Sequence, residues 1–329
     1  MTDIVTFKHP TGDGPEIKLT TVEVDSSLAD YDLRIEHIPV PDPDYVDLGM
    51  LYQLAQLEQV RRGPFAKTPL HLALRGHMGT GKDHDLEQFA ALLRVPHYRI
   101  PLTGEVRDIT LIGSVKLHGD GMGGTESRWE DGDITRALRG PALVNLSELN
   151  AAGAETLFAL HGLLDRHRAL ELPTGEMVRL RDDVRVFGTL NPTDLRDYAG
   201  TQTLNKAFAD RWIIWEKDFP NEDQLTAMLN RRYTTLGEDF IALIARLAVE
   251  VNASFTSTDA RTRVETPMSL RSVLDRFPAG LHVNNHRRDP LRSAWEDFIL
   301  PHIDAFDRDH YETVWAAVAR VGPKGPAFS

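Results

Sequence analysis

A short apolar segment that runs into a glycine-rich loop places the strongest constraint on how this chain can fold. His71-Leu72-Ala73-Leu74-Arg75 is typical of a buried parallel strand, and residues 83–93 follow the loop with a helical pattern. The loop reads Gly76-His77-Met78-Gly79-Thr80-Gly81-Lys82-Asp83 and matches G-x-x-x-x-G-K at each fixed position. Backbone N–H groups at such a helix start surround phosphate, and Lys82 adds a mobile positive charge. We therefore predict a nucleotide phosphate site at residues 76–83; the alternative is a glycine-rich turn without a ligand.

Asp83 is the unusual residue of this loop, because Ser or Thr ordinarily follows the lysine. An unpaired carboxylate about 4 Å from a phosphate charge costs roughly 1 to 4 kcal/mol, so a cation must accompany it. Mg²⁺ is the expected cation, since carboxylate oxygens are good ligands for this ion. The alternative is a degenerate position in a site that binds nucleotide weakly or not at all.

A second apolar segment, residues 142–146, ends in Ser147-Glu148, where nucleotide hydrolases with this loop usually have Asp-Glu. The Asp supports Mg²⁺ in those enzymes, and the Glu acts on the attacking water. Loop and strand have thus exchanged a hydroxyl and a carboxylate, which leaves the formal charge around the metal unchanged. We predict that Asp83 and Ser147 hold Mg²⁺ and that Glu148 is the catalytic carboxylate; loss of hydrolysis is the alternative.

The order of patterns along the chain predicts an α/β fold with a parallel sheet. Strand patterns at residues 97–100 and 184–190 alternate with helical patterns, of which residues 152–166 are one. After Pro220 the strand patterns stop, and helical segments are expected at residues 222–230, 237–251, 268–275 and 290–321. We therefore divide the chain into a β-rich extension and linker (1–46), an α/β nucleotide-binding domain (47–220) and a helical lid (221–329).

Composition excludes several classes of protein. The 329 residues contain no cysteine, which excludes disulfides and thiolate chemistry, and 37 Lys and Arg against 49 Asp and Glu give a net charge of −12. Such an acidic balance argues against a protein that coats nucleic acid. No segment reaches the ~20 apolar residues of a membrane span, and the start of the chain lacks the pattern of a secretion signal. We expect a cytoplasmic protein.

Three further segments carry a family resemblance. Asn191 follows the strand at 184–190, a Gly200-Thr201-Gln202 segment leads to Asp210-Arg211-Trp212, and Leu111-Ile112-Gly113 precedes Trp129-Glu130-Asp131-Gly132. Together with the phosphate loop, and in their order along the chain, these motifs resemble the MoxR-like branch of the AAA+ ATPases over roughly residues 40–300. Within that branch the chain most resembles the small ATPase subunit of aerobic cobaltochelatase, the CobS type.

The resemblance implies a P-loop AAA+ core, a parallel sheet sandwiched by helices, with a C-terminal all-helical lid. It assigns phosphate binding to Lys82, catalysis to Glu148 and the sensor 1 role to Asn191. Arg211 would be the arginine finger that reaches the neighbouring subunit's site, or alternatively a member of a structural ion pair. Arg271, in Ser269-Leu270-Arg271, would be sensor 2, or alternatively a solvated helix arginine.

The resemblance also implies ATP and Mg²⁺ as cofactors and a homo-oligomeric ring, expected to be a hexamer, that remodels a partner protein. A protein with a von Willebrand A-type domain and a role in metal chelation are the partner and process that it suggests. Residues 115–132 and 169–180 are expected to form two inserted hairpins of the kind that line the ring pore. A non-hydrolysing, structural or regulatory ring subunit is the second hypothesis, and a DNA-acting motor is the third.

Overall fold

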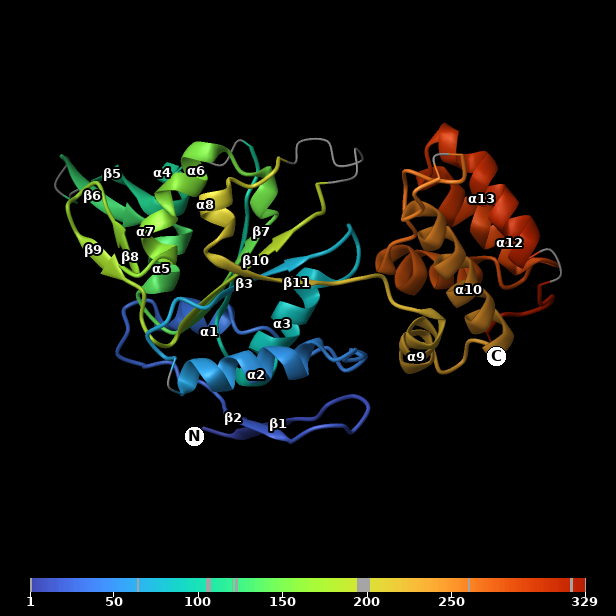
Figure 1. The fold of residues 1–329 in the computed structure, drawn as a ribbon, viewed down its shortest axis with the longest axis horizontal. Coiled ribbons are helices and arrows are strands. Elements are labelled where there is room, and N and C mark those ends of the chain that lie inside the picture. Colours follow the sequence, from blue (N-terminus) through green and yellow to red (C-terminus); the bar gives the residue numbers. More distant parts are fainter. Residues whose placement is uncertain are drawn as a thin grey trace. The chain divides into compact units, whose positions relative to one another are not determined.

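The computed structural model describes residues 2–63, 65–104, 108–119, 121, 124–193, 202–259, 261–319 and 322–328. The chain divides into two compact units (Figure 1). The first contains Met1–Asp42, Gly49–Gly76 and Lys82–Glu216, and the second contains Pro43–Leu48, His77–Gly81 and Lys217–Ser329. The boundary between these units therefore crosses the glycine-rich loop, and the division at residues 46 and 220 stays a prediction.

A five-stranded parallel sheet forms the centre of the first unit. Its strands lie in the order β11 (Trp212–Glu216), β3 (His71–Arg75), β10 (Val184–Leu190), β7 (Ala142–Ser147) and β4 (His97–Pro101). The predicted α/β class with a parallel sheet is confirmed. Because parallel strands end at the same edge, the residues that follow β3, β7 and β10 are brought to one side of the sheet.

Helices cover both faces of this sheet, as the alternation of side chains along β7 shows. Ala142, Val144 and Leu146 belong to a buried core that includes residues of α5 (Asp133–Leu138), α6 (Ala154–Ala159) and α7 (His161–Leu164). Asn145 and Ser147 face the other way and hydrogen bond to a residue of α3 (Lys82–Leu93). The polar side chains of β7 therefore all lie on the α3 face.

The predicted helix over residues 152–166 is wrong in its extent. A short 3₁₀ turn, η1 (Leu149–Ala151), precedes α6, and the helix is interrupted at Leu160 before α7 begins. Gly153 adopts an extended backbone immediately before α6, and Asp165 does so after α7. These two extended residues, which the helical periodicity does not reveal, set the ends of the helical segment.

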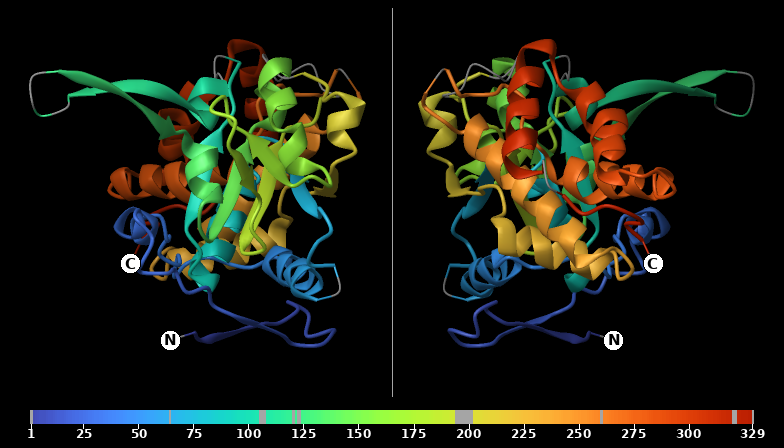
Figure 2. Two further views of the ribbon diagram at one scale, coloured as in Figure 1. Left: turned by 90° about the vertical axis from the view of Figure 1, so that its left-hand side faces the viewer. Right: turned by 90° about the vertical axis from the view of Figure 1, so that its right-hand side faces the viewer.

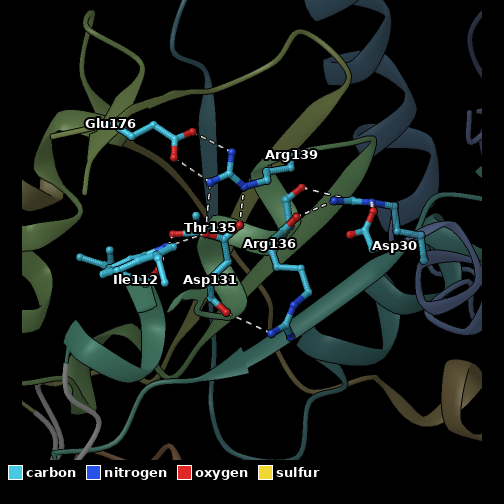
Figure 3. A network of polar contacts seen from close by, with 10 residues as sticks. Asp30, Ile112, Asp131, Thr135, Arg136, Arg139 and Glu176 are labelled. Carbon is cyan, nitrogen blue, oxygen red and sulfur yellow. Dashed lines mark hydrogen bonds and ion pairs between the residues drawn. The ribbon is translucent and has the colours of Figure 1, made fainter. Parts of the chain in front are cut away.

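The N-terminal part, predicted only as a β-rich extension and linker, forms a hairpin of β1 (Ile4–Phe7) and β2 (Ile17–Thr20), followed by an unpredicted helix α1 (Tyr31–Glu36). Helix α2 (Met50–Arg62) lies on the α3 side of the sheet, with Arg61 5.0 Å above the Phe187 ring. Arg34 of α1 is fully buried. It donates to Asp30 at 2.9 Å and to the Arg136 carbonyl of α5 at 2.5 Å (Figure 3). The guanidinium thus caps the negative end of α5 and anchors α1 to the core.

Both predicted hairpins are confirmed. β5 (Gly113–Gly119) pairs with β6 (Thr125–Asp131) after the short helix α4 (Asp108–Ile112), and β8 (Ala169–Glu171) pairs with β9 (Met177–Arg179). The β5–β6 hairpin projects from the rest of its unit (Figure 2). Arg139 joins the two hairpins, since it bonds Asp131 at the base of β5–β6 at 3.1 Å and Glu176 in the turn between β8 and β9 at 2.8 Å (Figure 3).

The second unit is helical in its described residues, apart from one isolated bridge between Leu236 and Phe328. Its elements are α9 (Glu222–Arg232), α10 (Glu238–Phe255), the π-helical turns η2 (Ser272–Arg276) and η3 (Trp295–Ile299), α11 (Phe277–Val283), α12 (Pro290–Ala294), the 3₁₀ turn η4 (Leu300–His302) and α13 (Ala305–Val318). Helix α8 (Lys206–Ala209) belongs to the first unit. Trp295 is buried against Tyr311 and Trp315. Pro301 lacks a backbone N–H, so the segment predicted at 290–321 is broken there.

No helix among the residues described is long and apolar enough to cross a membrane.

The buried contacts of Arg34 predict that Arg34→Ala lowers the free energy of unfolding by about 3 kcal/mol, because the Asp30 carboxylate and the α5 carbonyls lose their partner. Urea unfolding followed by tryptophan fluorescence measures this change. The control is Arg261→Ala, since Arg261 is 89% exposed and, among the described residues, forms its ion pair with the nearby Asp259. This control is expected to change the free energy by less than about 0.5 kcal/mol. Equal effects of the two substitutions would contradict the anchoring role.

Candidate functional site

Lys82 begins α3 and brings the glycine-rich loop and the end of β10 together. Its side chain is buried, and Nζ donates to the Gly76 carbonyl at 2.6 Å and to Asn191 Oδ1 at 3.2 Å. Asn150 fixes the backbone of Asn191, because its side-chain amide donates to the Asn191 carbonyl at 2.8 Å and accepts from the Asn191 N–H at 3.3 Å. Two residues predicted from separate motifs, Lys82 and Asn191, are therefore in direct contact.

The Asp83 carboxylate is the centre of a hydrogen-bond network that joins α3 to three strands. Its Oδ1 accepts from Asn145 Nδ2 at 2.9 Å and from Thr189 Oγ1 at 3.1 Å. Its Oδ2 accepts from Ser147 Oγ at 3.1 Å and from Arg99 Nη2 at 2.9 Å. Asp83 and Ser147, the pair predicted from the exchange of hydroxyl and carboxylate, thus lie side by side.

Arg99 is the charged donor of this network, and sequence reasoning missed it together with Asn145 and Thr189. It stands in β4 directly opposite Asn145 of β7, between Tyr98 and Ile100, which face the other side of the sheet. Its Nη2 also lies 3.5 Å from Ser147 Oγ. A charged residue between two apolar residues of a short strand was the available signal, but only the strand order β7-β4 shows which site it faces.

As arranged, Asp83 and Ser147 do not fit a magnesium site. The two carboxylate oxygens already accept from four side chains, and the Ser147 hydroxyl donates its proton to the carboxylate. Asn145 Oδ1 is buried without a partner among the described residues, but a single neutral amide oxygen is a poor set of ligands for this ion. In the part of the chain that the structure describes, no group of three or more His, Asp or Glu residues is placed to hold a metal.

Glu148 follows β7 and has an unusual backbone, with φ of +61° in the left-handed region. For a residue other than glycine this conformation costs about 1 to 2 kcal/mol. Its N–H donates to Thr189 Oγ1 at 3.3 Å, and its side chain is exposed. Within the described ranges its carboxylate makes no hydrogen bond or ion pair. The strained turn therefore presents this carboxylate to solvent at the edge where the strands end.

Arg211 lies between α8 and β11, away from the residues around Lys82 and Asp83. Its guanidinium donates to the Ala207 carbonyl, and its Nε is buried with no hydrogen-bond partner among the residues that the structure describes. No carboxylate among the described residues forms an ion pair with it, so the predicted alternative of a structural ion pair is not observed there. Gly200 and Thr201, which belong to the preceding motif, lie outside the described residues.

Loop residues 77–81 group with the second unit, where Gly79 packs against Ser269. Gly79 has φ of +78°, and a Cβ placed on it would lie 2.3 Å from the Ser269 Cβ, so only glycine fits. The Leu270 N–H donates to the Gly79 carbonyl at 3.0 Å. Arg271 follows directly and is exposed.

A cavity of about 400 Å³ opens beside this contact in the second unit. Loop residues Met78, Gly79 and Gly81 and the basic residues Arg271, Arg276 and His302 are among those that line it. Sequence reasoning singled out Arg271 but neither Arg276 nor His302. The cavity therefore joins part of the predicted phosphate loop to a group of basic side chains.

The geometry predicts strong coupling between Asp83 and Ser147. Asp83→Thr leaves Arg99 without its carboxylate, and Ser147→Asp places a second carboxylate against the first, so each is expected to lower stability by about 1 to 3 kcal/mol. The double variant returns one carboxylate beside Arg99 and is expected to recover most of the loss. Urea unfolding measures the cycle.

The control for this cycle combines Asp83→Thr with Arg128→Ala in β6, which shares no partner with the network. These two changes are expected to add within about 0.5 kcal/mol. Additive effects of Asp83→Thr and Ser147→Asp would contradict the coupling.

Comparison with known proteins agrees with the motifs. Residues 71–212 match the sequence profile of the AAA domain of the dynein-related subfamily. Over 269 residues the chain is 27% identical to the aerobic cobaltochelatase subunit CobS of Sinorhizobium, which covers 77% of this chain and 76% of the relative. An uncharacterized protein of Staphylococcus epidermidis is 26% identical over 206 residues, covering 62% of this chain and 76% of the relative. The resemblance predicted from the sequence is confirmed.

Proposed function

We propose that this chain, which matches the AAA domain of the dynein-related subfamily over residues 71–212 and is similar to the cobaltochelatase subunit CobS, binds ATP at the glycine-rich loop as a subunit of a homo-oligomeric ring. The observation that carries the proposal is the contact of Lys82 Nζ with the Gly76 carbonyl and with Asn191 Oδ1. An ammonium group held between the loop and the strand-end amide is placed to exchange these oxygens for those of the terminal phosphates.

Hydrolysis in this proposal depends on positioning and electrostatic stabilisation. Glu148 orients the attacking water, since its carboxylate is exposed at the carboxyl edge of the sheet. Asn191 contacts the γ-phosphate together with Lys82. Arg211 completes the site of the neighbouring subunit, which requires heterologous contacts around a ring, expected to be a hexamer. Arg271 contributes from the helical lid as sensor 2.

Magnesium usually accompanies nucleotide in AAA domains, and when bound it would neutralise the phosphates. The carboxylate that was predicted to hold it, Asp83, is bonded to Arg99 and three other donors. This observation favours a second candidate function, a ring subunit that binds nucleotide without hydrolysing it and has a structural or regulatory role.

For the partner, we propose a protein that the ring remodels, and the β5–β6 hairpin as the part that contacts it. Val115 and Leu117 of this hairpin are 61% and 73% exposed, which is a large apolar surface for a projecting hairpin. Since one relative is a cobaltochelatase subunit, a von Willebrand A-type protein and metal chelation are the partner and process that we propose first. The net charge of −12 gives no support to a DNA-acting motor.

Two substitutions separate binding from turnover. Lys82→Ala is expected to abolish ATP binding, because it removes the charge on the terminal phosphates. Glu148→Gln is expected to keep the affinity for ATP but to lower turnover at least about 100-fold, as for the loss of a positioned base. Steady-state phosphate release with Mg²⁺ present, together with a binding titration, measures both. Binding by the parent with no more turnover than Lys82→Ala would establish the second candidate, and no binding by the parent would contradict the proposal.

The role of Arg211 in the neighbouring subunit predicts complementation. Arg211→Ala alone is expected to lose turnover by about 1,000-fold, as arginine fingers do. In mixed rings with Glu148→Gln, a subunit that keeps Glu148 receives Arg211 from its neighbour, so part of the activity returns. The measurement is phosphate release against the mixing ratio, with particle size recorded with and without nucleotide. A mixture no more active than either variant alone would contradict this role.

A further inference from the structure

The residue beside the phosphate lysine carries a negative charge that the site has to balance. Asp83 follows Lys82 directly, at the start of α3, and its side chain is only partly exposed. A carboxylate near phosphate is repelled unless a cation lies against it. The structure already holds such a cation, because Arg99 Nη2 lies 2.9 Å from Asp83 Oδ2.

The other bonds of Asp83 fix this pairing. Asn145, Ser147 and Thr189 all donate to the carboxylate and all come from the face of the sheet that carries Arg99. A carboxylate has about four lone-pair positions, and four donors occupy them here. A metal ion therefore has to displace a donor in order to bind Asp83.

Arg99 has donors left for a ligand. Its Nη2 donates to Asp83 and Ser147. The other guanidinium nitrogens make no hydrogen bond to any residue that the structure describes. The side chain is 55% exposed. A planar guanidinium carries five N–H donors in a fixed geometry that suits carboxylate and phosphate oxygens, so one arginine can bind both at once.

We propose that Arg99 takes the place of the divalent cation at this site: it neutralises Asp83, binds the phosphates of a nucleoside triphosphate and makes nucleotide binding independent of Mg²⁺. This inference rests on the proposed function, since it concerns the same phosphate site. With Arg99, the charges of Lys82, Asp83 and Arg99 leave one net positive charge for the phosphates. Without it the charges of Lys82 and Asp83 cancel, and a metal ion is needed.

The experiment measures the equilibrium affinity for a fluorescent ATP analogue with excess EDTA and with Mg²⁺. The affinity of the parent is expected to differ by less than about threefold between the two conditions, well below the tenfold that corresponds to 1.4 kcal/mol. Arg99→Gln is expected to bind at least about tenfold more weakly in EDTA, because a charge-assisted bond is lost, and to recover when Mg²⁺ fills the vacated position beside Asp83. Arg99→Lys keeps the charge and is expected to retain most of the affinity in EDTA.

The matched control is Arg94→Gln, which removes an arginine of similar exposure that pairs at 2.9 Å with Asp3. It is expected to bind as the parent does in both conditions. The inference is overturned if the parent loses tenfold or more of its affinity in EDTA, or if Arg99→Gln behaves like Arg94→Gln. Absence of binding by the parent in both conditions overturns the proposed function itself. The comparison of the parent's affinity in EDTA with its affinity in Mg²⁺ needs no variant, so the test stands even if Arg99→Gln does not fold.

Discussion

The hydrogen bonds of the Asp83 carboxylate are the interaction on which the site depends. One side chain at the start of α3 is bonded to residues of β4, β7 and β10, so the helix start is fixed against three of the five strands. Hydrogen bonds to a charged group are each worth about 1.5 to 3 kcal/mol. Because Lys82 precedes Asp83 directly, this network also determines where the lysine ammonium meets the Gly76 carbonyl and Asn191.

The exchange of hydroxyl and carboxylate keeps the hydrogen bond between α3 and β7 but moves the negative charge from the strand to the helix. The Asp83–Ser147 hydrogen bond joins the helix to β7, as a Thr–Asp pair would do in the reverse arrangement. The negative charge now lies in the first turn of α3, where the helix dipole favours it. There it is also next to Lys82, and a positive side chain from β4, Arg99, pairs with it. Arg99 therefore balances the negative charge that the exchange places on the helix.

Local patterns were sufficient to predict part of this site. The apolar strand, the glycines and the helix that follows are contiguous in sequence, so the loop and the position of Lys82 followed from spacing alone. Both inserted hairpins followed from their turns. A carboxylate next to phosphate requires a cation, and Mg²⁺ was the expected one because residue spacing does not reveal which strands are neighbours. Arg99 is 16 residues from Asp83 in sequence and faces it only because β4 is the neighbour of β7.

Other features of the fold and the site could not be predicted, because they depend on burial and backbone conformation, which hydrophobic periodicity does not report. Arg34 in an unpredicted helix is fully buried because α5 offers it unpaired carbonyls, and a charged residue in a polar segment gives no sign of this. In the same way, the left-handed turn at Glu148 is visible only in the backbone.

The left-handed turn at Glu148 keeps its carboxylate apart from the Asp83 network, although both lie at the carboxyl edge of the sheet. The Asp83 network lies on the α3 face and holds its donors whether or not Glu148 acts on water, while the Glu148 carboxylate makes no bond to any described member of the network. In the function that we propose, nucleotide affinity therefore depends on Lys82, Asp83 and Arg99, whereas turnover depends on Glu148 and on Arg211 from a neighbour. The two proposed functions, a hydrolysing and a non-hydrolysing ring subunit, consequently require the same residues for nucleotide binding. In either of these proposals, loss of the Glu148 or Arg211 role would be enough to remove turnover without any change in Lys82, Asp83 or Arg99.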